Sequence, residues 1–239
     1  MRWSELKLKS RCWSRAAAGA LVLCAALAAA QSAPQRFVVV LDAAHGGSDV
    51  GAKLGNQAEK NYTLALNVKL RSQLGARGIT VVTTREADSV VEPDRRAEIA
   101  NHAGAAACLS LHAATTGSGV HLFVSSQAAV VVDRLAPWKT AQAAWTQRSL
   151  ALAGVLNSAL TNAGIAVTLG RTALPGVDSM SCPAVAVEVA PEHARIAQSG
   201  AKGAANFDDA GYQMRVVKAL AAALVEWREE AKNKEARQP

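Results

Sequence analysis

From residue 36 onward, short apolar runs alternate with stretches whose apolar residues recur every three or four positions. The runs are typical of strands buried on both faces, and the repeats are typical of helices. Strands separated by helices predict an α/β fold with a largely parallel, twisted central sheet flanked by helices. Since 50% of the 239 residues are hydrophobic, we expect a single domain with a sizeable core.

The approximate limits of these elements follow from local signals. Asn61 is the predicted cap of a helix with leucines at 66, 70 and 74, Pro93 suits the first turn of another helix, and Asp209 is the predicted cap of the last one. We expect strands near residues 37–41, 79–84, 105–111, 119–125, 165–169 and 183–189, and helices near 61–75, 93–104, 140–163 and 209–227.

The first thirty residues predict an export signal. Five basic residues precede an uncharged apolar stretch, residues 16–30, which is short for a membrane span and ends in small residues. We therefore expect a signal peptide at 1–30, a catalytic domain at 31–231 and a flexible polar tail at 232–239, in a protein exported to the periplasm or cell envelope. The alternative is an uncleaved membrane anchor.

The charge of the chain excludes one class of partner. The whole sequence has a formal net charge of +7, but about +3 remains without the signal segment, and no basic stripe with interleaved aromatic residues is visible. We expect no nucleic-acid partner. Cys108 and Cys182 remain in the domain, either as buried free thiols or as a disulfide, because spacing cannot establish proximity.

Polar side chains follow three of the expected strands. His45, His112 and Glu188 each lie at or just beyond the carboxyl end of an apolar run, and ligands bind at this edge of open α/β sheets. Two imidazoles and a carboxylate are the ligands of an open zinc site. Taken singly, each histidine is more typical of a loop or a core. His102 and His121 have no partner at metal-ligand spacing, so we expect them to be structural.

Several motifs occur together in one order along the chain. They are His-Gly-Gly-Ser-Asp-Val-Gly-Ala at 45–52, followed by residues 59, 84–85, 96–101, 110–113, 119–120 and 183–188. In this ordered set the chain resembles the zinc-dependent N-acetylmuramoyl-L-alanine amidases of type 3, which are cell-wall hydrolases.

The resemblance implies that His45, Glu59 and His112 ligate one Zn²⁺, with a water in the fourth position, and that Glu188 is the general base. The implied reaction is hydrolysis of the amide between N-acetylmuramic acid and L-alanine in peptidoglycan. Asp49 is expected to orient a ligand histidine or to form the turn. Arg85 and Arg96 are expected to be structural or to pair with a carboxylate, and Arg85 is a candidate for supporting the site from behind the ligands.

Two other functions stay open: a zinc peptidase on wall peptides, and a non-catalytic peptidoglycan-binding or regulatory protein. Retention of all three ligands and the glutamate favours an enzyme. We expect a monomer with peptidoglycan as its substrate, and a protein activator is left open. Residues 127–147, with Trp138 and Trp145, are either a lid over the site or a packed loop.

Overall fold

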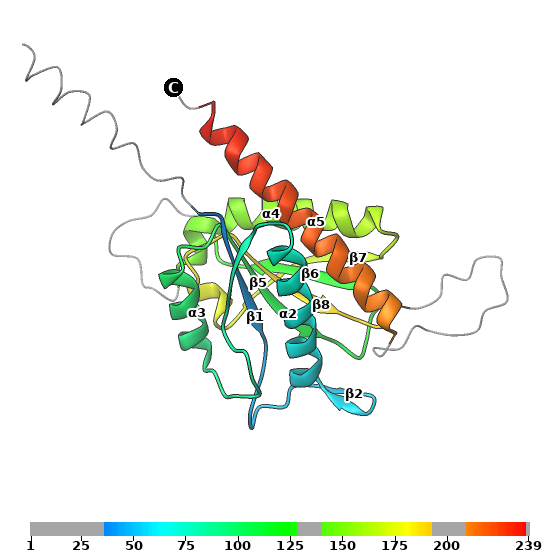
Figure 1. Ribbon diagram of the computed structural model, residues 1–239. Coiled ribbons are helices and arrows are strands. Elements are labelled where there is room, and N and C mark those ends of the chain that lie inside the picture. The colour runs from blue at the N-terminus through cyan, green and yellow to red at the C-terminus, as the bar shows by residue number, and fades with distance from the viewer. Residues whose placement is uncertain (1–35, 129–139, 193–208, 238–239) are drawn as a thin grey trace, which may run out of the picture. The chain divides into compact units, whose positions relative to one another are not determined.

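The computed structural model describes residues 36–128, 140–192 and 209–237, so the expected signal at 1–30 lies outside the described residues. The domain begins at Phe37 and is built on a six-stranded sheet of order β4-β1-β5-β8-β6-β7 (Figure 1). No helix within the described ranges is long and apolar enough to cross a membrane. The elements are β1 Val38–Ala43, β2 Lys53–Leu54, β3 Gln57–Ala58, α2 Glu59–Gly75, β4 Thr80–Thr83, α3 Pro93–His102, β5 Ala107–Ala113, β6 Val120–Ser125, α4 Gln142–Asn162, β7 Val167–Thr172, η2 Val177–Ser179, β8 Ala184–Val189 and α5 Ala210–Glu235.

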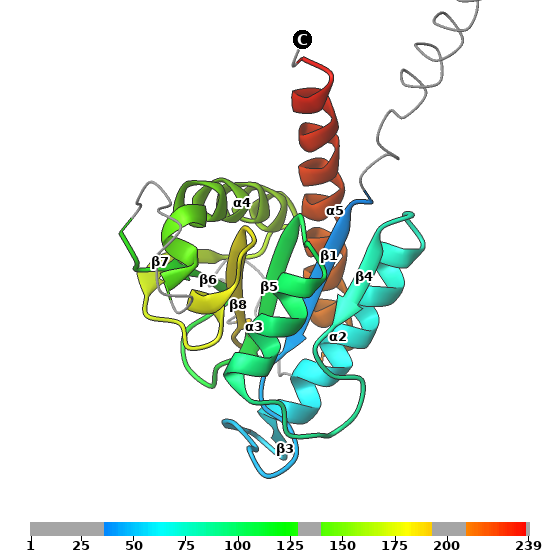
Figure 2. The same ribbon diagram turned by 90° about the vertical axis from the view of Figure 1, so that its left-hand side faces the viewer.

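Four adjacent strands of the sheet run parallel. β4, β1, β5 and β8 form parallel pairs, whereas β6 pairs with β8 antiparallel and β7 follows β6 in parallel (Figure 2). The predicted α/β fold with a largely parallel sheet flanked by helices is therefore confirmed. The sequence did not predict that β6 and β7 run opposite to the other strands. This direction places His121 of β6 beside Glu188 of β8.

The two faces of the sheet are covered unequally. Leu41, Leu109 and Val187 point to the face that packs against α2, α4 and α5 in the larger core cluster. The other face, with Cys108 and Ala184, packs against α3 and η2 in a smaller cluster, and α3 stands apart from the other helices (Figure 1). Side chains four positions apart on a strand share a face, so His112 and Glu188 lie on this thinly covered side. Each is the partly exposed position of an otherwise buried strand.

The predicted helix starts need one correction. Asp209 caps α5 as expected, because its carboxylate accepts hydrogen bonds from the backbone N–H groups of Gly211 and Tyr212. Asn61 is not the cap of α2. The β2–β3 hairpin runs directly into this helix, which begins at Glu59 with Ala58 as the capping residue. Glu59 therefore lies in the first turn, where a carboxylate is favoured by the helix dipole.

Two further boundaries differ from the prediction. β7 begins at Val167 and not at residue 165, because the N–H of Ile165 bonds to Leu160 O at the end of α4 and its side chain is buried in the core. α5 continues to Glu235, so the first four residues of the expected tail at 232–239 are helical. The lysines at 232 and 234 face the negative end of the helix dipole, which favours this extension.

Cys108 and Cys182 form a disulfide, which decides between the two alternatives. The bond joins β5 to the segment just before β8, 74 residues further along the chain. The disulfide lies at the beginnings of these two strands, and His112 and Glu188 lie near their carboxyl ends. The disulfide therefore ties together the strands that deliver two of the predicted site residues.

The described flanks of segment 127–147 lie at the edge of the sheet opposite the predicted site. β6 runs antiparallel to β8, so it ends beside the start of β8. At the other flank, the Gln142 amide donates to the carbonyls of Met180 and Cys182, at 2.6 and 2.8 Å. Trp145 is half-buried on α4, while Trp138 lies outside the described residues. The middle of the segment, residues 129–139, lies outside the described residues.

Candidate functional site

His45 stands in a turn that the backbone forms with unusual dihedral angles. It is the only non-glycine residue in the described ranges with a positive φ, at 62°. Gly46 follows with φ 134°, and a Cβ there would lie 2.2 Å from Ser89 O. A residue other than glycine cannot fit at that position. The Gly-Gly pair after His45 therefore sets the direction in which the imidazole points.

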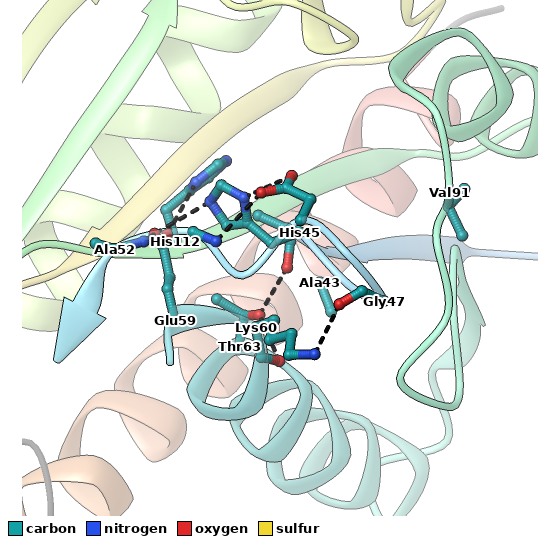
Figure 3. Close-up of polar contacts among 12 residues, drawn as sticks. Ala43, His45, Gly47, Ala52, Glu59, Lys60, Thr63, Val91 and His112 are labelled. Atoms are coloured by element: carbon teal, nitrogen blue, oxygen red, sulfur yellow. Dashed lines mark hydrogen bonds and ion pairs between the residues drawn. The ribbon is translucent and has the colours of Figure 1, made fainter. Parts of the chain in front are cut away.

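Three side chains from separate elements meet beside this turn. Glu59 lies between the two imidazoles, with Oε2 3.1 Å from His45 Nε2 and Oε1 3.3 Å from His112 Nδ1 (Figure 3). One ligand atom from each residue lies within 4.8 Å of the other two. The two rings are 5.6 Å apart between centroids and nearly perpendicular, at 88°. The predicted trio, from the turn after β1, from α2 and from β5, is thus brought together.

Hydrogen bonds hold Glu59 ionised in a buried position. Burial alone would raise the pKa of its carboxyl, but hydrogen bonds from His112, His45 and the N–H groups of Ala52 and Ala113 lower it well below its ordinary value. The hydrogen bond to Glu59 in turn raises the pKa of His45, against the effect of burial. The cluster therefore attracts positive charge.

The donor set fits a divalent cation of intermediate softness. Two imidazole nitrogens and one carboxylate match the three protein ligands of open zinc sites. Gly51, at φ 64°, is packed so closely here that a Cβ would lie 2.6 Å from His45 Cδ2 and 2.7 Å from Glu59 Oε2. The residues present are thus compatible with one metal ion.

Asp49 lies where it fixes the orientation of His45. Its Oδ2 is 2.8 Å from His45 Nδ1, which leaves Nε2 facing Glu59. This contact contributes to the raised pKa of His45 and to the lowered pKa of Asp49, whose burial acts in the opposite direction. Asp49 also forms the turn, because its carboxylate accepts a hydrogen bond from Gly51 N–H and its backbone exchanges hydrogen bonds with Gly46, so its position fits both of the roles considered for it.

Two arginines hold the backbone around His45 by donating hydrogen bonds to its carbonyl groups. Arg85 donates to the carbonyls of Ala43 and Ala44, at 2.8 and 3.0 Å. Arg96 donates to His45 O at 2.8 Å and pairs with buried Asp42 at 2.6 Å. Both arginines thus fix the end of β1, and Arg96 is the one that pairs with a carboxylate.

A lysine and an aspartate that sequence reasoning missed brace the same turn. Lys60 Nζ donates to Gly47 O at 2.7 Å (Figure 3). It also donates to Asp88 at 2.7 Å, and Asp88 accepts a hydrogen bond from Gly47 N–H. Lys60 follows Glu59 on α2, while Asp88 comes from the loop after β4. No local pattern marks either residue, because the contacts join segments far apart in the sequence.

Glu188 lies one strand away from the trio. It is the register partner of His112 across the β5–β8 pair and of His121 across the β8–β6 pair. Glu188 Oε1 is 2.8 Å from His121 Nδ1. His121 therefore has a partner that the sequence did not suggest. The one available signal was its position as a polar residue between the apolar residues Val120 and Leu122 of strand β6. His102, by contrast, is exposed and bonds to Glu98 O.

A cavity of about 260 Å³ opens beside His45 and His112 on the α3 side of the sheet. Its lining includes Asp42, Asp49, Ser110 and Arg96, together with residues 90–93. The two histidines are half-buried, so groups in this cavity reach them from solvent.

Comparison with known proteins decides the family. Residues 39–225 match the family model described as N-acetylmuramoyl-L-alanine amidase. The chain belongs to this family. The predicted resemblance is thereby confirmed.

Two curated relatives of this amidase-family chain match over shorter stretches. The germination-specific N-acetylmuramoyl-L-alanine amidase of Bacillus subtilis is 32% identical over 89 residues, 31% of this chain and 38% of that protein. The amidase AmiA of Escherichia coli is 43% identical over 77 residues, 32% of this chain and 27% of that protein. The matched part thus spans roughly a third of these relatives.

Solved structures share the fold of this amidase-family chain over most of its length. The catalytic domain of CwlV from Bacillus (Paenibacillus) polymyxa superposes with a TM-score of 0.60 at 24% identity, covering 81% of this chain and 98% of that domain. The CwlD amidase from Clostridioides difficile, solved with the GerS lipoprotein, gives a TM-score of 0.62 at 19% identity. This match covers 81% of this chain and 99% of the CwlD chain.

Proposed function

We propose that this protein is a zinc amidase that cleaves the amide between N-acetylmuramic acid and L-alanine of peptidoglycan. The observation that carries this proposal is the convergence of His45, Glu59 and His112, with Glu188 in register on the next strand. Family membership supports the choice of substrate class. The cavity beside the two histidines supports access of an extended substrate to the cluster.

Each side chain has a distinct task in this account. His45, Glu59 and His112 would hold the zinc, with Asp49 fixing the ring of His45. When bound, Zn²⁺ supplies Lewis-acid chemistry that activates water near neutral pH and polarises a carbonyl. Glu188 takes a proton from the attacking water and gives it to the leaving nitrogen of L-alanine.

The test separates binding of the metal from proton transfer. We expect Glu188→Gln to keep one zinc per chain and to lose turnover by a factor of about 100 or more, because the amide cannot accept the proton. Glu59→Gln should lose zinc itself, because it removes the anionic ligand. Exposed Glu98→Gln on α3 is the matched control and should behave like wild type. Loss of zinc from Glu188→Gln would make Glu188 a ligand and refute its role as the base.

We also propose that the protein is exported to the periplasm or cell envelope, where its substrate is found. We propose that it acts there as a monomer. The apolar segment that ends in small residues near position 30 supports export. Amino-terminal sequencing of the protein recovered from the envelope should give a start near residue 31. A retained Met1 would indicate an uncleaved anchor instead.

A further inference from the structure

We propose that His121 is a positioning residue that holds the carboxylate of Glu188 in the orientation needed for proton transfer. This inference rests on the proposed function, in which Glu188 is the base. It assigns a role to a histidine that the sequence suggested was merely structural.

The sheet places Glu188 between two histidines on one face. Register partners on neighbouring strands lie side by side on the same face of a sheet. Glu188 therefore stands between His112 on β5 and His121 on β6. His121 Nδ1 is 2.8 Å from Glu188 Oε1, which is the distance of a good hydrogen bond to a charged acceptor.

The imidazole of His121 is itself held by the loop that precedes β6. Gly117 has a φ of 85°, and a Cβ there would lie 2.2 Å from His121 Cε1 and 2.5 Å from Nε2. The backbone of this loop thus packs directly against the ring. The side chain of His121 is only 15% exposed, and the ring of Phe123 meets its edge at 6.4 Å between centroids. The ring therefore has little freedom to turn away from Glu188.

This arrangement restrains a side chain that would otherwise be mobile. The Glu188 side chain is 30% exposed, and His121 is the only described residue that bonds to its carboxylate. With the N–H at Nδ1 of His121 donating to Oε1, the second oxygen, Oε2, is left to accept a proton from water. A base must lie within hydrogen-bond reach of the proton it takes, and small misplacements cost up to about 100-fold in rate.

The experiment compares two substitutions that differ in one hydrogen bond. His121→Asn keeps an N–H donor near the place of Nδ1, whereas His121→Leu removes the donor. With a soluble muramoyl-peptide, we expect kcat of His121→Leu to fall about 10- to 100-fold while KM and zinc content stay near wild type. His121→Asn should recover most of that loss. His102→Leu, at an exposed histidine on α3, is the matched control.

Several results would overturn the inference. Wild-type kcat in a folded His121→Leu variant would do so, and so would equal losses in the Leu and Asn variants at unchanged zinc content. An inactive wild type with full zinc would instead refute the proposed function. The pairing is then tested without turnover, by the ¹⁵N shifts of His121 in metal-free protein. Nδ1 should be protonated, with shifts that change in Glu188→Ala; unchanged shifts would refute the contact.

Discussion

Replacing Arg96 by methionine should destabilise the domain strongly, because it leaves the buried carboxylate of Asp42 without its positively charged partner. Arg96 pairs with Asp42 at 2.6 Å, and the two side chains are only 10% and 5% exposed. Methionine keeps much of the apolar stem but removes the guanidinium and its bonds to Ala43 O and His45 O. Asp42 keeps hydroxyl donors from Thr84 and Ser110, which compensate only partly for the lost positive charge.

Breaking a buried ion pair by removing one partner costs about 3–5 kcal/mol. For a domain of this size, each kcal/mol lowers Tm by about 2–4 °C, so we expect Tm to fall by roughly 6–20 °C. Calorimetry on metal-free protein measures the effect without contributions from zinc. The matched control is Arg95→Met on the same helix, since its ion pair with Glu98 is 60% and 50% exposed. That pair should contribute less than about 1 kcal/mol.

A double-mutant cycle separates the effect of the unpaired Asp42 carboxylate from the effect of the lost packing of the Arg96 side chain. In the Asp42→Asn background there is no buried carboxylate to lose its partner. Arg96→Met should therefore lower the free energy of unfolding clearly less there than in wild type. Similar losses for Arg96→Met and Arg95→Met, or additive losses in the cycle, would refute the view that this ion pair anchors the end of β1.

Three further predictions follow from the same geometry. Reducing the disulfide, which closes 74 residues, should lower the free energy of unfolding in urea by about 4 kcal/mol, and an unchanged midpoint would contradict it. Gly51→Ala should lower zinc affinity, measured by titration against a chelator, because its Cβ would meet His45 and Glu59 at under 3 Å; Gly55→Ala, where the space is open, is the control. In metal-free protein, the raised pKa of His45 stabilises the fold fully below pH 6.5, and this stabilisation is lost as the pH rises. The lowered pKa of Glu59 stabilises the fold fully above pH 4.5, and this stabilisation is lost as the pH falls. The stability advantage of wild type over Glu59→Gln should therefore be greatest between about pH 4.5 and 6.5, and a pH-independent difference would refute the pairing.

Part of the site follows from the sequence by general rules. β1, β5 and β8 are apolar runs, and parallel neighbours bring their carboxyl ends to one edge. His45 and His112 could therefore be expected to meet. Glu59 is different, because its place depends on the β2–β3 hairpin, which the sequence did not predict. Only the family pattern pointed to that residue.

The contacts of His121 and Arg96 could not be predicted locally. The pairing of His121 with Glu188 exists because β6 runs antiparallel to β8; in a parallel arrangement the start of β6 would lie at the opposite edge of the sheet. Likewise, 54 residues separate Arg96 from Asp42 in the sequence. Such contacts depend on strand direction and helix placement, which periodicity does not encode.

The most direct test of the central claim is the identity of the bond that the purified protein cleaves. Zinc-loaded protein is incubated with purified sacculi, and the products are analysed by mass spectrometry together with the zinc content of the same sample. We predict stem peptides with new L-alanine amino termini, intact glycan chains, and loss of both products on chelation. Cleavage within the peptides, or no cleavage at one zinc per chain, would contradict the account.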